Sequence, residues 1–262
     1  MRYLLALSVL GLVLALGNGD LGRALWAGYQ TVHGEYYGSS SRINAWDLKL
    51  KPGQTSSSSM WLLADGGNQI MAGFHISPDV YNDTNLHFFV SWTGFVSAAV
   101  AHPAGLSPGS TVAQPSVYHG RQTDFTITVL KDGGNWSIYQ EVAGKQEAIG
   151  YFPGSLFTGL AEHATVVGWG GGVQATAGSA AGAPPMGCGH GPGEGPGGSA
   201  YVASIGVVVV NSGGKLSFPA VANVTSLTDA QDCYDVSVFQ VKQDGDSGGG
   251  FFYYGGPGGC NH

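Results

Sequence analysis

Histidine, cysteine and acidic side chains are the groups of this chain that can support acid–base, nucleophilic or metal chemistry. The eight histidines are scattered, and neither a His-x-x-x-His nor a Cys-x-x-Cys spacing typical of metal sites occurs. A phosphate-binding loop with Lys-Ser or Lys-Thr is also missing. We therefore expect no cofactor and no metal ion, and we interpret the histidines as exposed or hydrogen-bonded. A metal site assembled through space is the alternative.

The cysteines predict a single disulfide. The chain has three of them, Cys188, Cys233 and Cys260, and one pair plus one remaining thiol is the simplest count for an exported protein. Cys233 and Cys260 flank the C-terminal segment and are the preferred pair. Cys188 would then be a free thiol or bridge two molecules. Three buried, reduced cysteines are the alternative.

The first 19 residues have the pattern of a signal peptide. Arg2 precedes the apolar run from Leu4 to Leu16, and Gly17-Asn18-Gly19 forms a candidate cleavage zone. The run is short for a membrane span, and no later stretch is long and apolar enough to cross a bilayer. We predict a signal peptide over 1–19 and a secreted protein. An uncleaved anchor or a buried first element is the alternative.

Charge and modification signals also fit an extracellular protein. Sequons for N-glycosylation occur at Asn82, Asn135 and Asn223. The net charge is −7 and no long basic run is present, so we expect no nucleic-acid partner. Only 10% of the residues are charged, whereas glycine is abundant with 45 residues, and this composition is typical of a folded chain with many turns and few helices.

Alternating strand patterns dominate the chain after the N-terminal segment. The clearest hairpin is 124–140, where a turn rich in Asp and Gly joins two β-rich runs. Residues 200–210 form a β-branched run typical of a central strand, and 155–164 is the one stretch with helical spacing. We interpret the Gly-, Ala- and Pro-rich stretch 178–198 as a long loop, with a linker between two domains as the alternative. These patterns predict one all-β domain over 28–262, an antiparallel β-sandwich with long Gly/Pro-rich loops.

Ten short blocks of the chain resemble the neprosin family of glutamic peptidases. They occur in the family's order and spacing, from about Tyr29 to the C-terminus. The blocks are Glu35–Gly38, Ile43–Trp46, Ile70–Phe74, Ser77–Tyr81, Gly150–Pro153, Leu156–Phe157, Gly168–Val173, Met186–His190, Cys233–Val236 and Phe251–Gly258. The resemblance implies a secreted β-sandwich with a long open cleft on one face, and a disulfide between Cys233 and Cys260.

The same resemblance implies a peptidase mechanism that this chain lacks the residues to perform. The family uses two glutamates to activate a water molecule, and it prefers to cut after proline at acid pH. Two close carboxylates with different pKa values are needed, one as the base and one as the acid. The two matching positions here are Met71 and Gly172. A thioether and a bare glycine cannot transfer protons.

Other acids are weaker candidates for a rearranged catalytic pair. Glu194 lies in the Gly/Pro-rich stretch and Asp79 follows one of the matching blocks, while Glu35 and Glu162 lie elsewhere. Any such pair would have to converge within a few Å on the cleft. We interpret each of these side chains as a solvated loop acid.

The expected function is therefore that of a non-catalytic extracellular binding or structural protein. His75 and Trp169 would line the cleft, which would hold an extended peptide or a glycan; a place for Trp169 in the core is the alternative. A surface with few charges leaves sheet edges open to pairing, so a homo-oligomer or fibre is a variant of this hypothesis. The competing hypothesis is an endopeptidase for proline-containing peptides at acid pH, with a rearranged acid pair, and enzymatic activity stays open between the two.

Overall fold

The fold was analysed in a computed structural model of the chain. It describes residues 22–92, 95–96, 106–177, 182–219, 221, 223–242 and 249–260. The predicted signal peptide, 1–19, lies outside these residues. Within the described ranges, no helix is long and apolar enough to span a bilayer.

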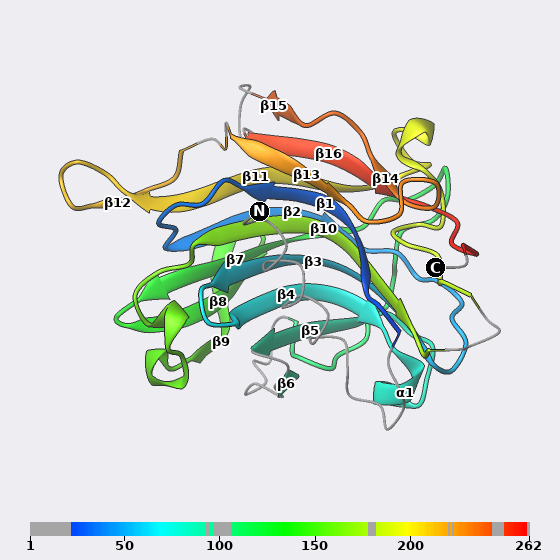
Figure 1. Cartoon of the computed structure of the whole chain (residues 1–262), viewed down its shortest axis with the longest axis horizontal. Helices are drawn as coiled ribbons and strands as arrows, with labels where there is room; N and C mark the ends of the chain where they lie inside the picture. The colour runs from blue at the N-terminus through cyan, green and yellow to red at the C-terminus, as the bar shows by residue number, and fades with distance from the viewer. Residues whose placement is uncertain are drawn as a thin grey trace.

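The first of two antiparallel sheets has seven strands (Figure 1). In spatial order they are β13 (Val224–Thr228), β1 (Leu25–Thr31), β10 (Val166–Ala175), β3 (Gln54–Ala64), β4 (Asn68–Ile76), β5 (His87–Trp92) and β6 (Phe95–Val96). The first residue of β1, Leu25, lies N-terminal of the predicted domain start at residue 28. Neighbours such as β3 and β10 pair over ten residues, so their side chains are held in a fixed register.

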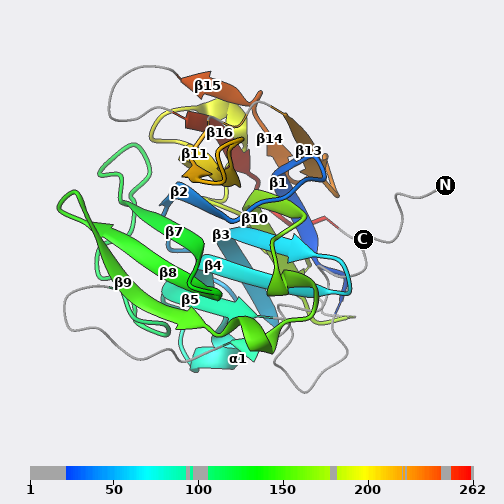
Figure 2. The same cartoon turned by 90° about the vertical axis from the view of Figure 1, so that its left-hand side faces the viewer.

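The second antiparallel sheet has nine strands and lies beside the first (Figure 2). Its main path is β14 (Asp235–Val236), β16 (Gly249–Gly255), β11 (Ala200–Val210), β2 (Gly38–Asn44), β7 (Asp124–Asp132), β8 (Asn135–Val142) and β9 (Lys145–Phe152). Two short strands extend it, β12 (Leu216–Ser217) on β11 and β15 (Gln240–Lys242) on β16. The predicted antiparallel β-sandwich is confirmed.

The main hydrophobic core fills the space between the sheets. Strands such as β4 contribute every second side chain to it, here Ile70, Ala72, Phe74 and Ile76, as the alternation of a pleated strand allows. Two hydrogen bonds cross the core: the Trp169 indole donates to Ser39 Oγ at 3.0 Å, and the Tyr254 hydroxyl bonds to Ser58 Oγ at 2.6 Å. Because Trp169 and Tyr254 are fully buried, an unpaired polar atom on either ring would cost about 1–3 kcal/mol.

Two of the predicted local elements are confirmed and one is wrong. β7 and β8 form the expected hairpin, and β11 spans the expected β-branched run. The predicted helix over 155–164 is instead two 3₁₀ turns, Gly154–Leu156 and Gly159–Ala161. Glycine at the start of both turns disfavours a continuous helix. In the described chain the α-helical segment is the single turn α1 (Pro78–Tyr81).

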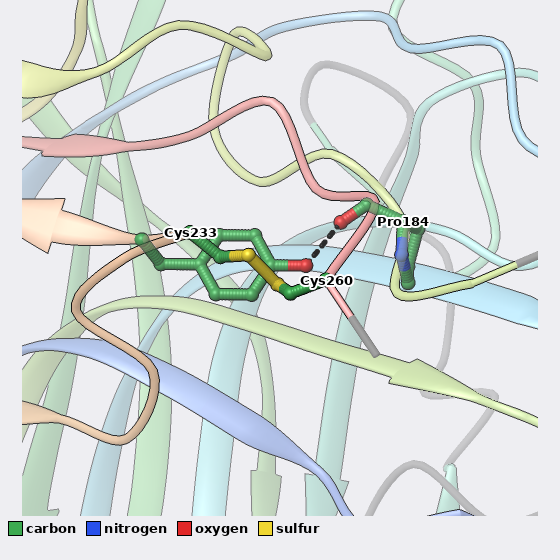
Figure 3. Close-up of a disulfide and its surroundings, with 4 residues drawn as sticks. Pro184, Cys233 and Cys260 are labelled. Carbon is green, nitrogen blue, oxygen red and sulfur yellow. Dashed lines mark hydrogen bonds between the residues drawn. A yellow bond between two sulfur atoms is a disulfide. The ribbon is translucent and has the colours of Figure 1, made fainter. Parts of the chain in front are cut away.

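The Gly/Pro-rich loop joins the two sheets of one sandwich and is fastened to the C-terminal segment. Met186 and Gly256 exchange backbone hydrogen bonds, and Gly259 N–H donates to Ala183 O. The predicted disulfide Cys233–Cys260 is present, beside the hydrogen bond from the buried Tyr234 hydroxyl to Pro184 O (Figure 3). Residues 182–198 are therefore held against the C-terminal segment of the sandwich.

The remaining cysteine, Cys188, is a free and buried thiol. Its Sγ donates to Gly198 O at 3.2 Å, and burial raises its pKa. A buried thiol with a raised pKa reacts slowly, because the thiolate is the nucleophile. This location does not favour a disulfide between two molecules.

Candidate functional site

The face of the seven-stranded sheet turned away from the main core, here called the distal face, carries the two family positions. On β4, Ile70, Ala72 and Phe74 belong to the main core, so Met71 and His75 lie on the distal face. On β10, Val173 belongs to the main core, and Gly172 is therefore distal. The sandwich thus brings the two predicted positions to one face, with β3 between their strands.

A second, small hydrophobic cluster occupies the distal face. It consists of Ala24, Trp26, Trp61, Met71 and Phe89, all buried. In the sheet register Met71 pairs with Trp61 on one side and Ser91 on the other. Directly opposite residues in neighbouring strands have Cβ atoms about 5 Å apart. Met71 therefore has an aromatic neighbour on β3 and a hydroxyl neighbour on β5.

The two tryptophan rings of this cluster lie against glycines of β10. A Cβ atom added to Gly172 would lie 2.6 Å from Cζ3 of Trp26, and one added to Gly168 would overlap the indole of Trp61. The two indoles also contact each other edge-on, with centroids 5.2 Å apart. The space that a side chain at position 172 would use is filled by Trp26.

Several polar atoms of the distal face are buried without a hydrogen-bond partner. Ten buried side-chain N or O atoms are unpartnered in the described part of the chain. Six of them belong to distal residues: Trp26 Nε1, Ser59 Oγ, Trp61 Nε1, Gln69 Oε1, Ser91 Oγ and Gln174 Oε1. Three of these, the donors on Ser59, Trp61 and Ser91, belong to strands that flank Met71. They are groups that a carboxylate would accept bonds from, whereas a thioether is a weak acceptor.

His75 is part of a buried aromatic and polar cluster at the other end of β4. Its Nε2 is 2.6 Å from the Tyr81 hydroxyl, and its ring stacks on Phe89. Tyr81 stacks on His87, whose Nε2 is 2.9 Å from Asp83 Oδ1. Burial, with a smaller contribution from His87, lowers the pKa of His75 to about 3. His75 is therefore a neutral structural side chain at ordinary pH.

The other predicted site residues do not lie on the distal face. Trp169 is fully buried in the main core, which is the alternative left open from the sequence. Asp79, on α1, accepts a hydrogen bond from the backbone N–H of Gly53 at 2.9 Å. Glu194 lies in the Gly/Pro-rich loop and has entirely different partners. The structure does not show these two acids as a pair.

Glu194 fastens its loop to the segment around Tyr118. The Tyr118 hydroxyl donates to one carboxylate oxygen, and His190 Nδ1 is 2.9 Å from the other. The rings of Tyr118 and His190 stack at 4.4 Å. The Tyr118 hydrogen bond, and secondarily His190, lowers the pKa of Glu194. Within the described ranges, the hydrogen-bond partners of this carboxylate are a tyrosine hydroxyl and a histidine ring, and neither is a second acid.

The remaining predicted features lie at the surface. Of the sequon asparagines, Asn82 and Asn223 are exposed and Asn135 is partly exposed at the β7–β8 turn. Within the described ranges, no three His, Cys, Asp or Glu side chains gather as metal ligands would.

The sequence did not single out Trp26, Trp61, Ser59 or Ser91. They come from strands β1, β3 and β5, and only the strand order brings them around β10 and β4. The sequence did contain a local signal for Trp61. It lies two residues after Ser59, the last serine of the serine-rich run, so on a strand the two side chains share one face. No signal in the sequence pairs Trp26 with Gly172.

The family was tested by comparison with known proteins. A sequence model of the Neprosin family, described as "Neprosin", matches residues 52–257. The chain belongs to the Neprosin family. The matched range includes Met71, Gly172 and Glu194, so the two positions inferred from the resemblance lie within the Neprosin domain.

Two solved peptidase structures match this chain at low identity. Scytalido-glutamic peptidase with a peptide-based transition state analog is 12% identical, with a TM-score of 0.46, over 89% of this chain and 98% of that chain. SCP-B, a member of the eqolisin family in a complex with the tripeptide Ala-Ile-His, is 12% identical with a TM-score of 0.44, over the same shares.

A methyl group at position 172 tests whether Trp26 fills the distal face of this Neprosin domain. Gly172→Ala should lower the free energy of unfolding by about 1–3 kcal/mol, because the new Cβ overlaps the Trp26 ring. The loss should shrink in a Trp26→Leu background, as a double-mutant cycle in urea would measure. Gly206→Ala, where a Cβ meets nothing within 4 Å, is the matched control. Equal losses at both glycines would contradict the packing.

The lowered pKa of His75 predicts a loss of stability in acid. The folded pKa is about 3 and the unfolded value 6.5, so the unfolded state binds the extra proton and stability falls from pH 6.5 towards pH 3. Between pH 7 and pH 4 this one group should remove about 3 kcal/mol. The His75→Gln variant can still hydrogen-bond to Tyr81. Between pH 7 and pH 4, its free energy of unfolding, measured with urea, should fall by about 3 kcal/mol less than that of the parent. Identical pH dependences would contradict a buried neutral His75.

Proposed function

We propose that this Neprosin domain is an exported, non-catalytic binding protein of the extracellular space. The observation that carries the proposal is the buried apolar cluster at the two family positions. Met71 offers a thioether and Gly172 offers no side chain, and Trp26 fills the space over Gly172. Water activation by a carboxylate pair needs an acid and a base at these places.

The donors around Met71 support the match between Met71 and a family glutamate. Ser91 is the register partner of Met71 on β5, while Ser59 and Trp61 lie on the neighbouring strand β3, and each keeps a buried donor group without a partner among the described residues. Each unpaired group costs about 1–3 kcal/mol. A polar shell of this kind is expected where a carboxylate has been replaced, since the shell is useful only with an acceptor at its centre.

Export is supported by the covalent features of the chain. Disulfides persist in oxidising compartments, and Cys233–Cys260 is formed here. The three sequon asparagines are exposed or partly exposed, as N-glycosylation requires. Together with the signal-like N-terminus, these features favour a secreted glycoprotein.

A peptidase with a rearranged acid pair is the competing function. It requires two convergent carboxylates, and the described contacts of Asp79 and Glu194 are separate. Glu194 is also held by Tyr118 and His190, which favour its ionised form. This arrangement supports a structural role in fastening the loop.

The proposal predicts that the protein does not cleave peptides. The purified domain is incubated with an unstructured proline-rich protein from about pH 2 to pH 6, where carboxylic acids exchange protons, and fragments are analysed by mass spectrometry. We expect no cleavage above the background of a heat-denatured sample, and no change with Glu194→Gln. Cleavage after proline that Glu194→Gln abolishes would establish the peptidase instead.

Reintroducing an acid tests the polar shell. Met71→Glu should fold and cost at least about 2 kcal/mol less than Ile70→Glu, because position 71 lies between two strands that carry buried, unpartnered donors on the same face, whereas Ile70 belongs to the main core. Urea unfolding at pH 7 measures the difference. Equal destabilisation would show that the shell is unable to hold a carboxylate. Met71→Glu should stay inactive towards peptides, because Gly172 still supplies no second acid.

A further inference from the structure

A group of aromatic rings lies on the outer face of the nine-stranded sheet, far from the distal face. On β16, Phe252 and Tyr254 enter the main core, so Phe251 and Tyr253 point outward. On β11, Tyr201 lies between the core residues Ala200 and Val202 and also points outward. We call Tyr201, Phe251 and Tyr253 the aromatic platform.

The platform is compact and partly exposed. Tyr201 and Phe251 stack with centroids 6.0 Å apart, and Phe251 meets Tyr253 edge-on at 4.8 Å. Tyr201 and Tyr253 are direct partners in the β11–β16 register. All three side chains have intermediate exposure. The rings hold one another in place, so a ligand that binds them does not have to order loose side chains.

The groups beside the platform are polar but carry no net charge. The Tyr201 hydroxyl donates to Asp124 Oδ2, and Arg42 Nε lies 3.6 Å from the same oxygen. The Arg42 side chain is 38% exposed, and its Nε is buried without a hydrogen-bond partner. The next outward positions across the sheet carry hydroxyls, with Thr128 Oγ1 donating to Ser40 Oγ.

We propose that the aromatic platform binds a neutral polysaccharide. The C–H faces of sugar rings pack on aromatic rings, while sugar hydroxyls both donate and accept hydrogen bonds. Asp124 and Arg42 offer an acceptor and a donor for such hydroxyls next to the rings. Because the charges of Arg42 and Asp124 are paired with each other, the described part of this surface favours an uncharged ligand over an acidic or basic one.

A protein partner fits this surface less well. Interface cores are rich in apolar contacts, whereas the platform is bordered by Arg42, Asp124 and hydroxyl groups. The inference rests on the proposed binding function and assigns that function to a surface outside the family's catalytic positions.

Affinity electrophoresis tests the proposal. The mature domain is run through native gels that contain hydroxyethyl cellulose, galactomannan or laminarin as neutral probes, and polygalacturonate as the charged control. We expect retardation by at least one neutral probe and none by polygalacturonate. Tyr253→Ala and Phe251→Ala should weaken binding at least about tenfold, as the loss of a stacking ring implies. Tyr151→Ala, an exposed tyrosine on edge strand β9 of the same sheet, should bind as the parent does.

Two controls separate the possible outcomes. Melting temperatures must show that the platform variants are folded, and Phe251→Leu provides a milder change if an alanine variant is unstable. Absence of retardation by all neutral probes, or equal binding by platform variants, would overturn the proposal. A shift from dimer to monomer in light scattering, caused by the same variants, would instead make the platform an interface between copies. Peptide cleavage by the parent would overturn the proposed non-catalytic function. It would not affect the conclusion from affinity electrophoresis on whether the platform binds a polysaccharide.

Discussion

The close approach of two tryptophan rings to β10 is the constraint on which the distal face depends. Trp26 and Trp61 take the space over Gly172 and Gly168, and this is possible only because neither glycine has a Cβ. The same contact holds β1 and β3 on either side of β10. Any side chain long enough to carry a carboxylate at position 172 would displace an indole and open the small hydrophobic cluster. The packing of Trp26 is therefore incompatible with such a side chain at position 172.

The pKa values and the partners of the ionisable groups are consistent with the packing of the distal face. Buried ionisable groups that serve catalysis have pKa values close to the working pH, whereas burial moves the pKa of His75 far below it. The carboxylates that are ionised, such as Glu194, have local partners that explain them. The buried donors of Ser59, Trp61 and Ser91, on the strands that flank β4, are the exception, because they have no partner among the described residues.

The two sheets differ in what they offer to other molecules. On the distal face of the seven-stranded sheet, Trp26 and Trp61 are buried against glycines of β10. Trp26 fills the space that a side chain at position 172 would use. The outer face of the nine-stranded sheet keeps Tyr201, Phe251 and Tyr253 partly exposed beside a closed ion pair. This contrast follows from the aromatic run on β16, where successive rings alternate between the core and the surface. A binding function is therefore easier to place on the second face than on the first.

The sequence by itself determined the fold class, the hairpin of β7 and β8, the strand β11, the disulfide pair and the family, because these depend on local alternation, turn residues and ordered blocks of residues. It also identified Met71 and Gly172 as positions without acids. The sequence wrongly predicted a helix over 155–164, where glycines at both turn starts outweighed the apolar spacing. Only the tertiary structure placed Trp169 in the core and Trp26 over Gly172, and only it separated Asp79 from Glu194. Those facts depend on strand order and register, which join residues more than a hundred positions apart and leave no periodic trace in the chain.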